Sequence, residues 1–419
     1  MTTSPGRTVF LGPDPLPALG SHLPVICTDG CGLSRTSEPG WEDFPKPGAA
    51  STAALLRGAA VQARLHSGVE DMVVWKSSAE VEQIAEKLGV TVANSPALIS
   101  RRIENKTYFS RAAESAGLPI PPTRVGVAGP ELQLAVRELR GPFVFQLARG
   151  YSGEQTYLAE SGKELEELIQ RFNGRSCRVA EMVPGTPVTL TGVVSPERLV
   201  IGPACLQLTG LPTLTPHPLG SCGNDYGRPV PEPEGVHEVG LRMAEWLRRQ
   251  GHLGIFGLDL VVGANGMVVC IEVNPRLVAS VPLFSLSARD LDSPSILDLH
   301  LASFGIGEQA AQQLDCHWSQ LILYQLRDRL PDPELQSSRG SLTATGEFTQ
   351  IGDLELMGPP AHELGLLVQA QSRSGKELAR VFLEGACCSP DGLLLPQLQH
   401  LVGQLRALLE VAPSAGDVS

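Results

Sequence analysis

One segment, Asp259–Arg276 (DLVVGANGMVVCIEVNPR), constrains the fold of this chain more than any other. Two runs of mostly apolar residues flank Asn265-Gly266, the dipeptide preferred in two-residue type I′ hairpin turns. Such a turn makes the segment a β-hairpin and places Asp259 directly opposite Glu272. The register of this hairpin therefore decides which side chains share a face.

The predicted register gives the hairpin one apolar and one polar face. The apolar pairs are Val262 with Val269, Leu260 with Ile271, and Leu258 with Val273. On the polar face Asn274 follows the opposed Asp259 and Glu272, whose Cβ atoms are expected about 4.5–5.5 Å apart. Two carboxylates this close raise a pKa unless a cation lies between them. Because Mg²⁺ takes Asp, Glu and Asn oxygens, these three residues are predicted to bind a divalent metal. The alternative is a surface hairpin with hydrated acids.

The residues that end the hairpin favour the metal site over the hydrated surface. Pro275 stands just past the strand, where it ends the ladder of hydrogen bonds. Arg276 follows at once and carries a fixed charge suited to phosphate or carboxylate. An anionic ligand is therefore expected beside the metal.

Length and composition limit the class of protein. The chain has 419 residues, too many for one ordinary core, so two or three domains are expected. A net charge of -12 argues against general nucleic-acid binding. No apolar run is long enough to cross a membrane, and the N-terminal MTTSPGR lacks the core of a secretion signal. The nine scattered Cys, with no zinc pattern at Cys27 and Cys31, are expected to be reduced thiols in a cytoplasmic protein.

Residues 1–100 are expected to form a small α/β unit. A helix is predicted to begin at Ser77, with Glu80 completing a capping box, and to end at Gly89. Because strands and helices alternate, the sheet should be parallel. The expected strands are 8–11, 24–27 and 72–75.

The middle of the chain should alternate helices, strands and turns. A helix with Lys106 near its start is expected to stop at Gly117. Small residues and an arginine at 148–156 suit a loop that folds over phosphates. The Pro- and Gly-rich residues 210–235 are expected to form a long loop. The remaining expected elements are strands at 143–147, 157–159 and 177–183 and a helix at 236–250.

The last part of the chain gives weaker patterns. Residues after Arg276 are expected to be loop-like through Pro294. Short strands, among them 321–324 and 366–368, are expected between 316 and 395. A closing helix carries Leu398, Leu401 and Leu405 on its apolar face, and the tail at 413–419 is expected to be disordered.

The order of these pieces resembles the ATP-grasp superfamily over about residues 90–280. The resemblance is carried by Asn105-Lys106 before AGLPIPPT, by FVFQLARGYSGEQT, by AEMVPGTPV, and most specifically by Asp259 with EVNPR. It implies an α/β chain with α+β elements: a Rossmann-like pre-ATP-grasp domain and an ATP-grasp domain with a central lid subdomain. A small C-terminal α+β region is weakly similar to biotin-carboxylase-like members. The implied boundaries are 1–95, 96–300 with the lid at about 123–185, and 301–412.

The resemblance also implies roles for single residues. ATP and Mg²⁺, with Mn²⁺ as an alternative ion, are the implied cofactors, and Asp259, Glu272 and Asn274 are the implied metal ligands. Lys106 would hold phosphate oxygens, and Arg276 would stabilise the acylphosphate or the oxyanion formed during amine attack. The other implied nucleotide contacts are Gln146, Arg149, Gly150, Ser152, Gly153, Glu181, Met182 and Val183.

Three positions depart from the family pattern. Gln146 stands where a second phosphate-contacting Lys is usual, Pro187 where an acid holds the ribose, and Ala180 where another acid is common. Replacing a charge-assisted bond by a neutral one forfeits about 1 kcal/mol or more. Our hypothesis is that Arg149 supplies the missing charge.

The implied activity is ATP-dependent ligation of a small-molecule carboxylate to an amine, in a protein that is a homodimer by default and binds neither nucleic acid nor membrane. One alternative is a degenerate nucleotide-binding protein, favoured by Gln146 and Pro187 and opposed by the complete metal set. Another is a biotin-carboxylase-like enzyme, which would need biotin on a second protein because this chain has no Ala-Met-Lys-Met segment. Substrate specificity is expected at Gly12–Asp14 and at 210–228.

Overall fold

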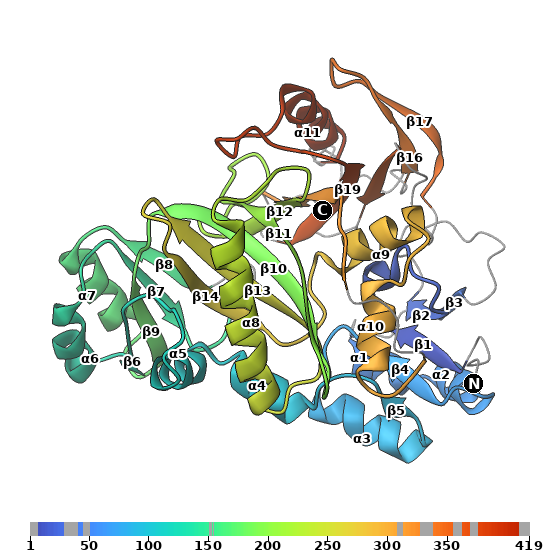
Figure 1. Cartoon of the computed structure of the whole chain (residues 1–419), viewed down its shortest axis with the longest axis horizontal. Helices are drawn as coiled ribbons and strands as arrows, with labels where there is room; N and C mark the ends of the chain where they lie inside the picture. The colour runs from blue at the N-terminus through green and yellow to red at the C-terminus, as the bar shows by residue number, and fades with distance from the viewer. Residues whose placement is uncertain are drawn as a thin grey trace, which may run out of the picture.

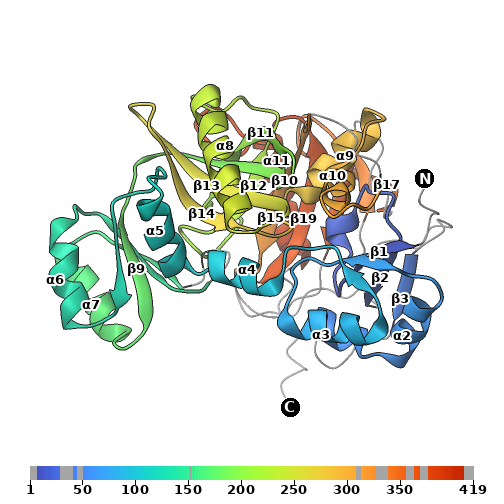
Figure 2. The same cartoon turned by 60° about the horizontal axis from the view of Figure 1, so that its bottom comes forward.

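Three β-sheets organise the molecule (Figures 1 and 2). The computed structural model describes residues 7–28, 41–44, 51–150, 153, 155–307, 313–326, 338–354, 363–368 and 376–409. A five-stranded and a four-stranded sheet lie at opposite ends, with a ten-stranded sheet between them. Cys31 and the tail at 413–419 lie outside the described residues.

The N-terminal unit is a parallel sheet with helices, as the sequence predicts. Its strands are β1 (Thr8–Leu11), β2 (Val25–Thr28), β3 (Trp41–Phe44), β4 (Asp71–Val73) and β5 (Thr91–Val92), in the order β3-β2-β1-β4-β5. The connecting elements are η1 (Leu16–Ala18), α1 (Thr52–Leu56), α2 (Ala59–His66) and α3 (Ala79–Leu88).

The start of α3 differs from its prediction by one residue. Ser78, which has extended backbone, is the N-cap, and its hydroxyl accepts the N–H of Val81 at 3.2 Å. Ser77 instead donates to Glu82 at 3.0 Å, and Glu80 pairs with Arg57. The predicted capping box is therefore wrong, because Ser78 as N-cap makes Val81 the third helical residue, and Glu80 pairs with a cation outside the helix.

The second unit is an antiparallel sheet flanked by helices. Its strands are β6 (Thr123–Val127), β7 (Phe143–Leu147), β8 (Thr156–Ala159) and β9 (Ser176–Glu181), in the order β6-β9-β7-β8. The helices here are α6 (Pro130–Ala135), η2 (Val136–Glu138) and α7 (Gly162–Arg171). Two further helices, α4 (Ala97–Ile103) and α5 (Lys106–Ser115), lead into this unit, and Asn105 caps α5 through the N–H groups of Thr107 and Tyr108.

The large sheet is antiparallel throughout and runs into the C-terminal region without a break. Its order is β14-β13-β10-β11-β12-β15-β19-β18-β16-β17. The bounds are β10 (Gly185–Val194), β11 (Leu199–Thr209), β12 (Ser221–Asp225), β13 (Gly254–Gly263), β14 (Val268–Asn274), β15 (Trp318–Tyr324), β16 (Ser338–Leu342), β17 (Phe348–Asp353), β18 (Leu364–Val368) and β19 (Glu377–Glu384). The helices are α8 (Pro233–Arg249), α9 (Val281–Asp290), α10 (Ile296–Ala302) and α11 (Pro396–Leu409).

Two predicted loops contain regular structure. Within 210–235, Ser221–Asp225 forms β12 because it pairs with β11 on one side and β15 on the other. Within 276–294, Val281–Asp290 forms α9, whose first eight residues are all buried. Both elements depend on partners distant in the sequence, which local patterns do not show.

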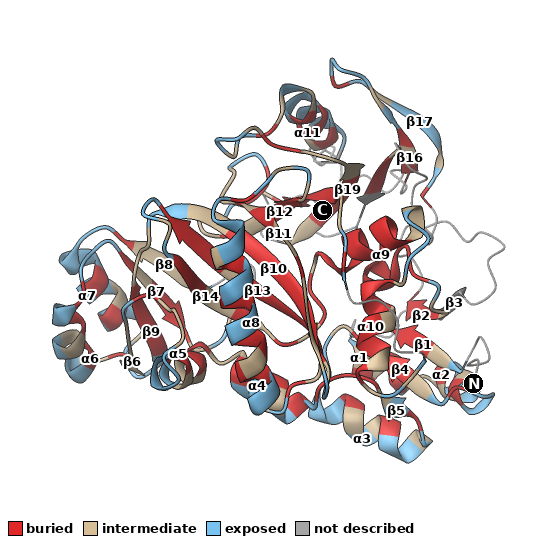
Figure 3. Ribbon diagram, in the orientation of Figure 1, coloured by how far each residue is buried: buried red, intermediate tan, exposed pale blue. Residues whose placement is uncertain are grey.

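Burial follows the sheets and the helices that cover them (Figure 3). The largest core lies between α8 and the strands beneath it and continues to α11, with Trp246, Phe256 and Leu401 among its members. Within the described ranges, no helix has the length and apolar character needed to cross a bilayer. The eight cysteines among the described residues are all free thiols, as expected.

Candidate functional site

The hairpin of β13 and β14 places Asp259 opposite Glu272, as predicted, although its turn and the pairs next to the turn differ from the prediction. The turn has three residues, Ala264–Gly266, closed by the N–H of Gly263 donating to the carbonyl of Met267 at 2.8 Å. This turn shifts the pairs next to it by one residue, so Val262 faces Val268 and Leu260 faces Cys270. The predicted two-residue turn and its nearby apolar pairs are therefore wrong.

A β-bulge restores the register. Between Leu260 and Asp259 the partner strand carries one extra residue, Ile271, after which Asp259 faces Glu272 and Leu258 faces Val273 as predicted. The carbonyl of Ile271 accepts a hydrogen bond from Arg178 at 2.9 Å, and the N–H of Cys270 donates to the carbonyl of Pro119 at 2.7 Å. The bulge thus joins the outer edge of β14 to the four-stranded sheet and its linker.

Lys106 and Gln207 complete the polar face. Lys106 is almost fully buried, and its Nζ donates to Glu272 Oε1 at 2.8 Å. Gln207 on β11 donates to Asp259 Oδ1 at 2.7 Å, and the Asn274 amide lies 3.4 Å from Asp259 Oδ2. Two carboxylates, two amides and one ammonium therefore converge at this face.

The two carboxylates differ in their affinity for protons. Burial, reinforced by the charge of Glu272, raises the pKa of Asp259 to about 7. Burial also acts on Glu272, but the charges of Lys106, Arg178 and Arg276 outweigh it and lower the pKa of this carboxyl. A site with one carboxylate already paired and a second that resists ionisation fits a divalent cation, which would favour ionisation of Asp259. Among the described residues no group of three or more His, Cys, Asp or Glu side chains is placed to hold a metal ion, so the third ligand here would be the Asn274 amide oxygen, which accepts a hydrogen bond from Arg276.

Arg276 connects this face to the N-terminal unit. Its guanidinium donates to Asn274 Oδ1 at 3.0 Å and to Glu104 Oε1 at 2.9 Å. It also lies 5.3 Å from the centre of the Trp75 ring, within cation–π range. Lys76 pairs with the same Glu104 carboxylate. The arginine is thus held in a fixed orientation next to a predicted metal ligand.

A buried arginine lies beside Gln146, the position at which the family pattern has a lysine. Arg178 pairs with Gln146 across β7 and β9, and its Nε donates to Gln146 Oε1 at 3.0 Å. Its nearly inaccessible side chain is also close enough to Glu272 to affect the pKa of that residue. Arg149, which we expected to supply this charge, is exposed. Arg178 is therefore the cation that the structure places at Gln146.

Described residues of the predicted phosphate-binding loop at 148–156, here called the glycine-rich loop, contact α5 and the 210–220 segment. The carbonyl of Ala148, next to Arg149 and Gly150, accepts the N–H of Lys106 at 3.0 Å. A Cβ on Gly153 would lie 2.9 Å from the Cα of Gly220, so the two segments touch. Ser152, a predicted phosphate contact, lies outside the described residues.

The strand predicted at 177–183 is present as β9 (Ser176–Glu181), and the predicted nucleotide contacts at its end have partly engaged polar groups. Glu181 accepts the N–H of Arg140 at 2.8 Å, and the N–H of Met182 donates to the carbonyl of Pro142 at 2.8 Å. Val183 follows, half-buried. Pro187 is tolerated in β10 because pairing with β11 begins only at Val188.

Comparison with known proteins identifies the fold. Residues 103–280 match the family model described as ATP-grasp domain, so this part of the chain has the ATP-grasp fold. No curated protein sequence gives a significant match.

Several solved structures share the fold along most of the chain. An N5-carboxyaminoimidazole synthase from Aspergillus clavatus, with ADP and 5-aminoimidazole ribonucleotide, is 13% identical, with 95% of this chain and 98% of that chain covered and a TM-score of 0.60. A biotin carboxylase from Campylobacter jejuni is 13% identical, with 91% and 87% covered and a TM-score of 0.62. The biotin carboxylase domain dimer of a Hydrogenobacter thermophilus 2-oxoglutarate carboxylase, with MgADP and bicarbonate, is 10% identical, with 96% and 89% covered and a TM-score of 0.59.

Four residues of this site have no counterpart among the predictions. Gln207 and Glu104 hold Asp259 and Arg276, Arg178 lies beside Gln146, and Trp75 stacks on Arg276. Arg178 has one signal in the sequence: it is one of only two charged residues in a mostly apolar strand segment (CRVAEMV), the other being Glu181.

Proposed function

We propose that the chain is an ATP- and Mg²⁺-dependent ligase that converts a substrate carboxylate to an acylphosphate for attack by an amine. The carboxylate oxygen bonds to the γ-phosphorus as the bond to ADP breaks, and the amine then displaces phosphate. The observation that carries this proposal is the convergence of Asp259, Glu272 and Asn274 beside the buried ammonium of Lys106. Structures of the same fold hold ADP, with magnesium in one case.

Each residue has a task that its contacts support. Asp259, Glu272 and Asn274 would hold Mg²⁺ or Mn²⁺, which when bound neutralises phosphate charge. Lys106 is fixed at the start of α5 and can exchange its bond to Glu272 for one to a phosphate oxygen. Arg276, held by Glu104 and Trp75, would stabilise negative charge on the acyl group.

A nucleotide-binding protein without catalysis is the second candidate. Gln146 and Pro187 favour it because each replaces a charged group of the family pattern. Arg178 opposes it, since a cation is still present at Gln146. The biotin carboxylases of similar fold keep bicarbonate among the candidate substrates. A cytoplasmic location and a homodimer belong to the proposal as well; one similar structure is a domain dimer.

Measurement of ADP release tests the proposal. The wild-type chain is incubated with MgATP and paired panels of carboxylates and amines, and separately with bicarbonate. Glu272→Gln should reduce ADP formation at least a hundredfold, about 2.7 kcal/mol of transition-state stabilisation, in a chain that is still folded by thermal unfolding. Glu114→Gln, which alters an exposed carboxylate of α5, is the matched control. Wild-type turnover in Glu272→Gln would exclude the metal assignment, and MgATP binding without ADP formation would favour the second candidate.

A further inference from the structure

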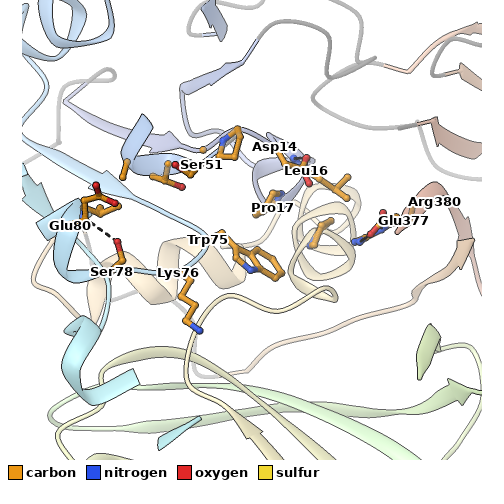
Figure 4. A pocket seen from close by; sticks show the side chains of 16 residues that line it. Asp14, Leu16, Pro17, Ser51, Trp75, Lys76, Ser78, Glu80, Glu377 and Arg380 are labelled. Carbon is orange, nitrogen blue, oxygen red and sulfur yellow. Dashed lines mark hydrogen bonds and ion pairs between the residues drawn. The ribbon is translucent and has the colours of Figure 1, made fainter. Parts of the chain in front are cut away.

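A pocket of about 480 Å³ lies between the N-terminal unit and the C-terminal part of the large sheet (Figure 4). Its walls come from the segment after β1, the start of α1, the segment between β4 and α3, Pro282 of α9, and two residues of β19. The segment Gly12–Asp14, where we predicted specificity, forms part of the wall. The pocket is therefore placed to receive a small molecule.

Trp75 and Lys76 join this pocket to the metal-binding hairpin. Both residues line the pocket, and Arg276 lies over the Trp75 ring at 5.3 Å. Arg276 in turn donates to Asn274 at 3.0 Å. The pocket wall includes Trp75 and Lys76 but not Arg276, so the end of a ligand at these two residues would lie towards Arg276 and the predicted metal site.

The charges of the pocket are unevenly compensated. Glu377 pairs with Arg380 at 2.6 Å, and Glu80 pairs with Arg57. At one end, Lys76 and Arg276 share the single carboxylate of Glu104, which leaves an excess of positive charge there.

Asp14 provides the opposite charge. Asp14 Oδ1 accepts the N–H of Leu16 at 2.9 Å, and no ion pair joins Asp14 to a cation within the described ranges. The Asp14 side chain is exposed to solvent. Desolvation and the charge of Glu377 raise its pKa to about 6, although the charge of Arg380 opposes this shift, so the carboxylate is ionised at pH 7.5. In Figure 4 Asp14 and Lys76 lie on opposite sides of the Trp75 ring.

We propose that this pocket binds an amino-acid-like zwitterion, with its ammonium group at Asp14 and its carboxylate towards Lys76 and Arg276. The inference rests on the proposed function, because it identifies the class of carboxylate to be activated. Trp75, Leu16 and Pro17 would contact the apolar part of the ligand.

The same charges disfavour the ligands of the proteins of similar fold. The phosphate of an aminoimidazole ribonucleotide could lie at Lys76, but that ligand would then bring no cation to Asp14 at the other end of the pocket. Bicarbonate would leave Asp14 without a cation. The ligand that satisfies both ends carries an ammonium and a carboxylate together.

Titration calorimetry without nucleotide tests the pocket directly. The probes are the proteinogenic L-amino acids and, for any that binds, its decarboxylated amine and its deaminated acid. We expect at least one amino acid to bind with a Kd below about 1 mM, and both analogues to bind at least tenfold more weakly. Absence of binding by every amino acid, or equal binding by the deaminated acid, would overturn the proposal.

The variant Asp14→Asn isolates the charge at one end. Asparagine keeps the Oδ1 that accepts the N–H of Leu16, so the fold should be retained, and thermal unfolding checks this. We expect the Kd for the amino acid to rise at least tenfold, with no change in Asp353→Asn, a matched variant of an exposed aspartate on β17. An unchanged Kd in Asp14→Asn would overturn the inference. If that variant does not fold, the analogue series on the wild-type chain decides.

The proposed function is tested separately. MgATP binding and ADP release are measured on the same protein. Amino-acid binding without ADP release would contradict the ligase and leave the pocket intact, whereas ADP release with other carboxylates alone would contradict the pocket and leave the ligase intact.

Discussion

Arg178 should be necessary for nucleotide affinity, because it carries the positive charge beside Gln146. Arg178→Met removes bonds to Gln146 Oε1 at 3.0 Å and to the carbonyl of Ile271 at 2.9 Å. Leaving a buried and a partly buried acceptor unsatisfied costs about 1–3 kcal/mol each, so the free energy of unfolding should fall by about 2–6 kcal/mol. Loss of one charge-assisted contact should raise the Kd for MgATP about tenfold, or about 1.4 kcal/mol.

A double variant that moves the positive charge to the neighbouring strand separates its effect on MgATP affinity from its effect on the stability of the fold. Gln146→Lys combined with Arg178→Met moves the cation to the neighbouring strand, at the position directly paired with the original one. This double variant should recover most of the MgATP affinity, measured by calorimetry, while recovering less of the thermal stability. Arg149→Ala provides the comparison for the alternative arginine. Unchanged MgATP affinity in a folded Arg178→Met, together with a large loss in Arg149→Ala, would refute the reasoning and support the exposed arginine instead.

Two further predictions follow from the hairpin. The pKa of Asp259 is raised from 3.8 to about 7 in the folded chain without metal, so the stability conferred by its protonation is lost as the pH rises between these values. Mg²⁺ should therefore raise the unfolding midpoint more at pH 8, where Asp259 is ionised, than at pH 5.5. An equal rise at both pH values would contradict this prediction. A Cβ on Gly257 would lie 2.7 Å from Val278 Cγ1, so Gly257→Ala should lower the free energy of unfolding by about 1–3 kcal/mol. The control Gly162→Ala, where no atom lies within 4 Å of the added Cβ, should not lower it. Equal denaturation midpoints of the two variants would contradict the predicted crowding at Gly257.

The site residues on the β13–β14 hairpin could be predicted from the alternation of side chains along paired strands. Asp259, Glu272 and Asn274 share a face because their positions alternate along paired strands, and Lys106 follows from the start of a helix. Gln207, Arg178 and Glu104 were not predictable, because each reaches the site from an element brought there by long-range pairing or packing. The same limit explains β12 and α9, which exist because of partners far along the chain.

The hairpin also shows that a contact can be predicted correctly from an incorrect turn and strand register. Asn265-Gly266 favours a two-residue turn, yet the chain uses three residues and then adds Ile271 as a bulge. The two differences cancel at Asp259 and Glu272, so the predicted opposition of these carboxylates is present. No local pattern distinguishes a bulge residue such as Ile271 from any other apolar strand residue.

Because of this bulge, β14 is one residue longer than its partner requires. Loss of a single residue between Met267 and Glu272 could be absorbed by removal of the bulge, and the metal ligands would still face one another. Gain of one residue would require a second bulge or turn Glu272 to the apolar face. Among related chains, we therefore expect length variation in this strand to be one-sided, with one-residue deletions tolerated and insertions absent.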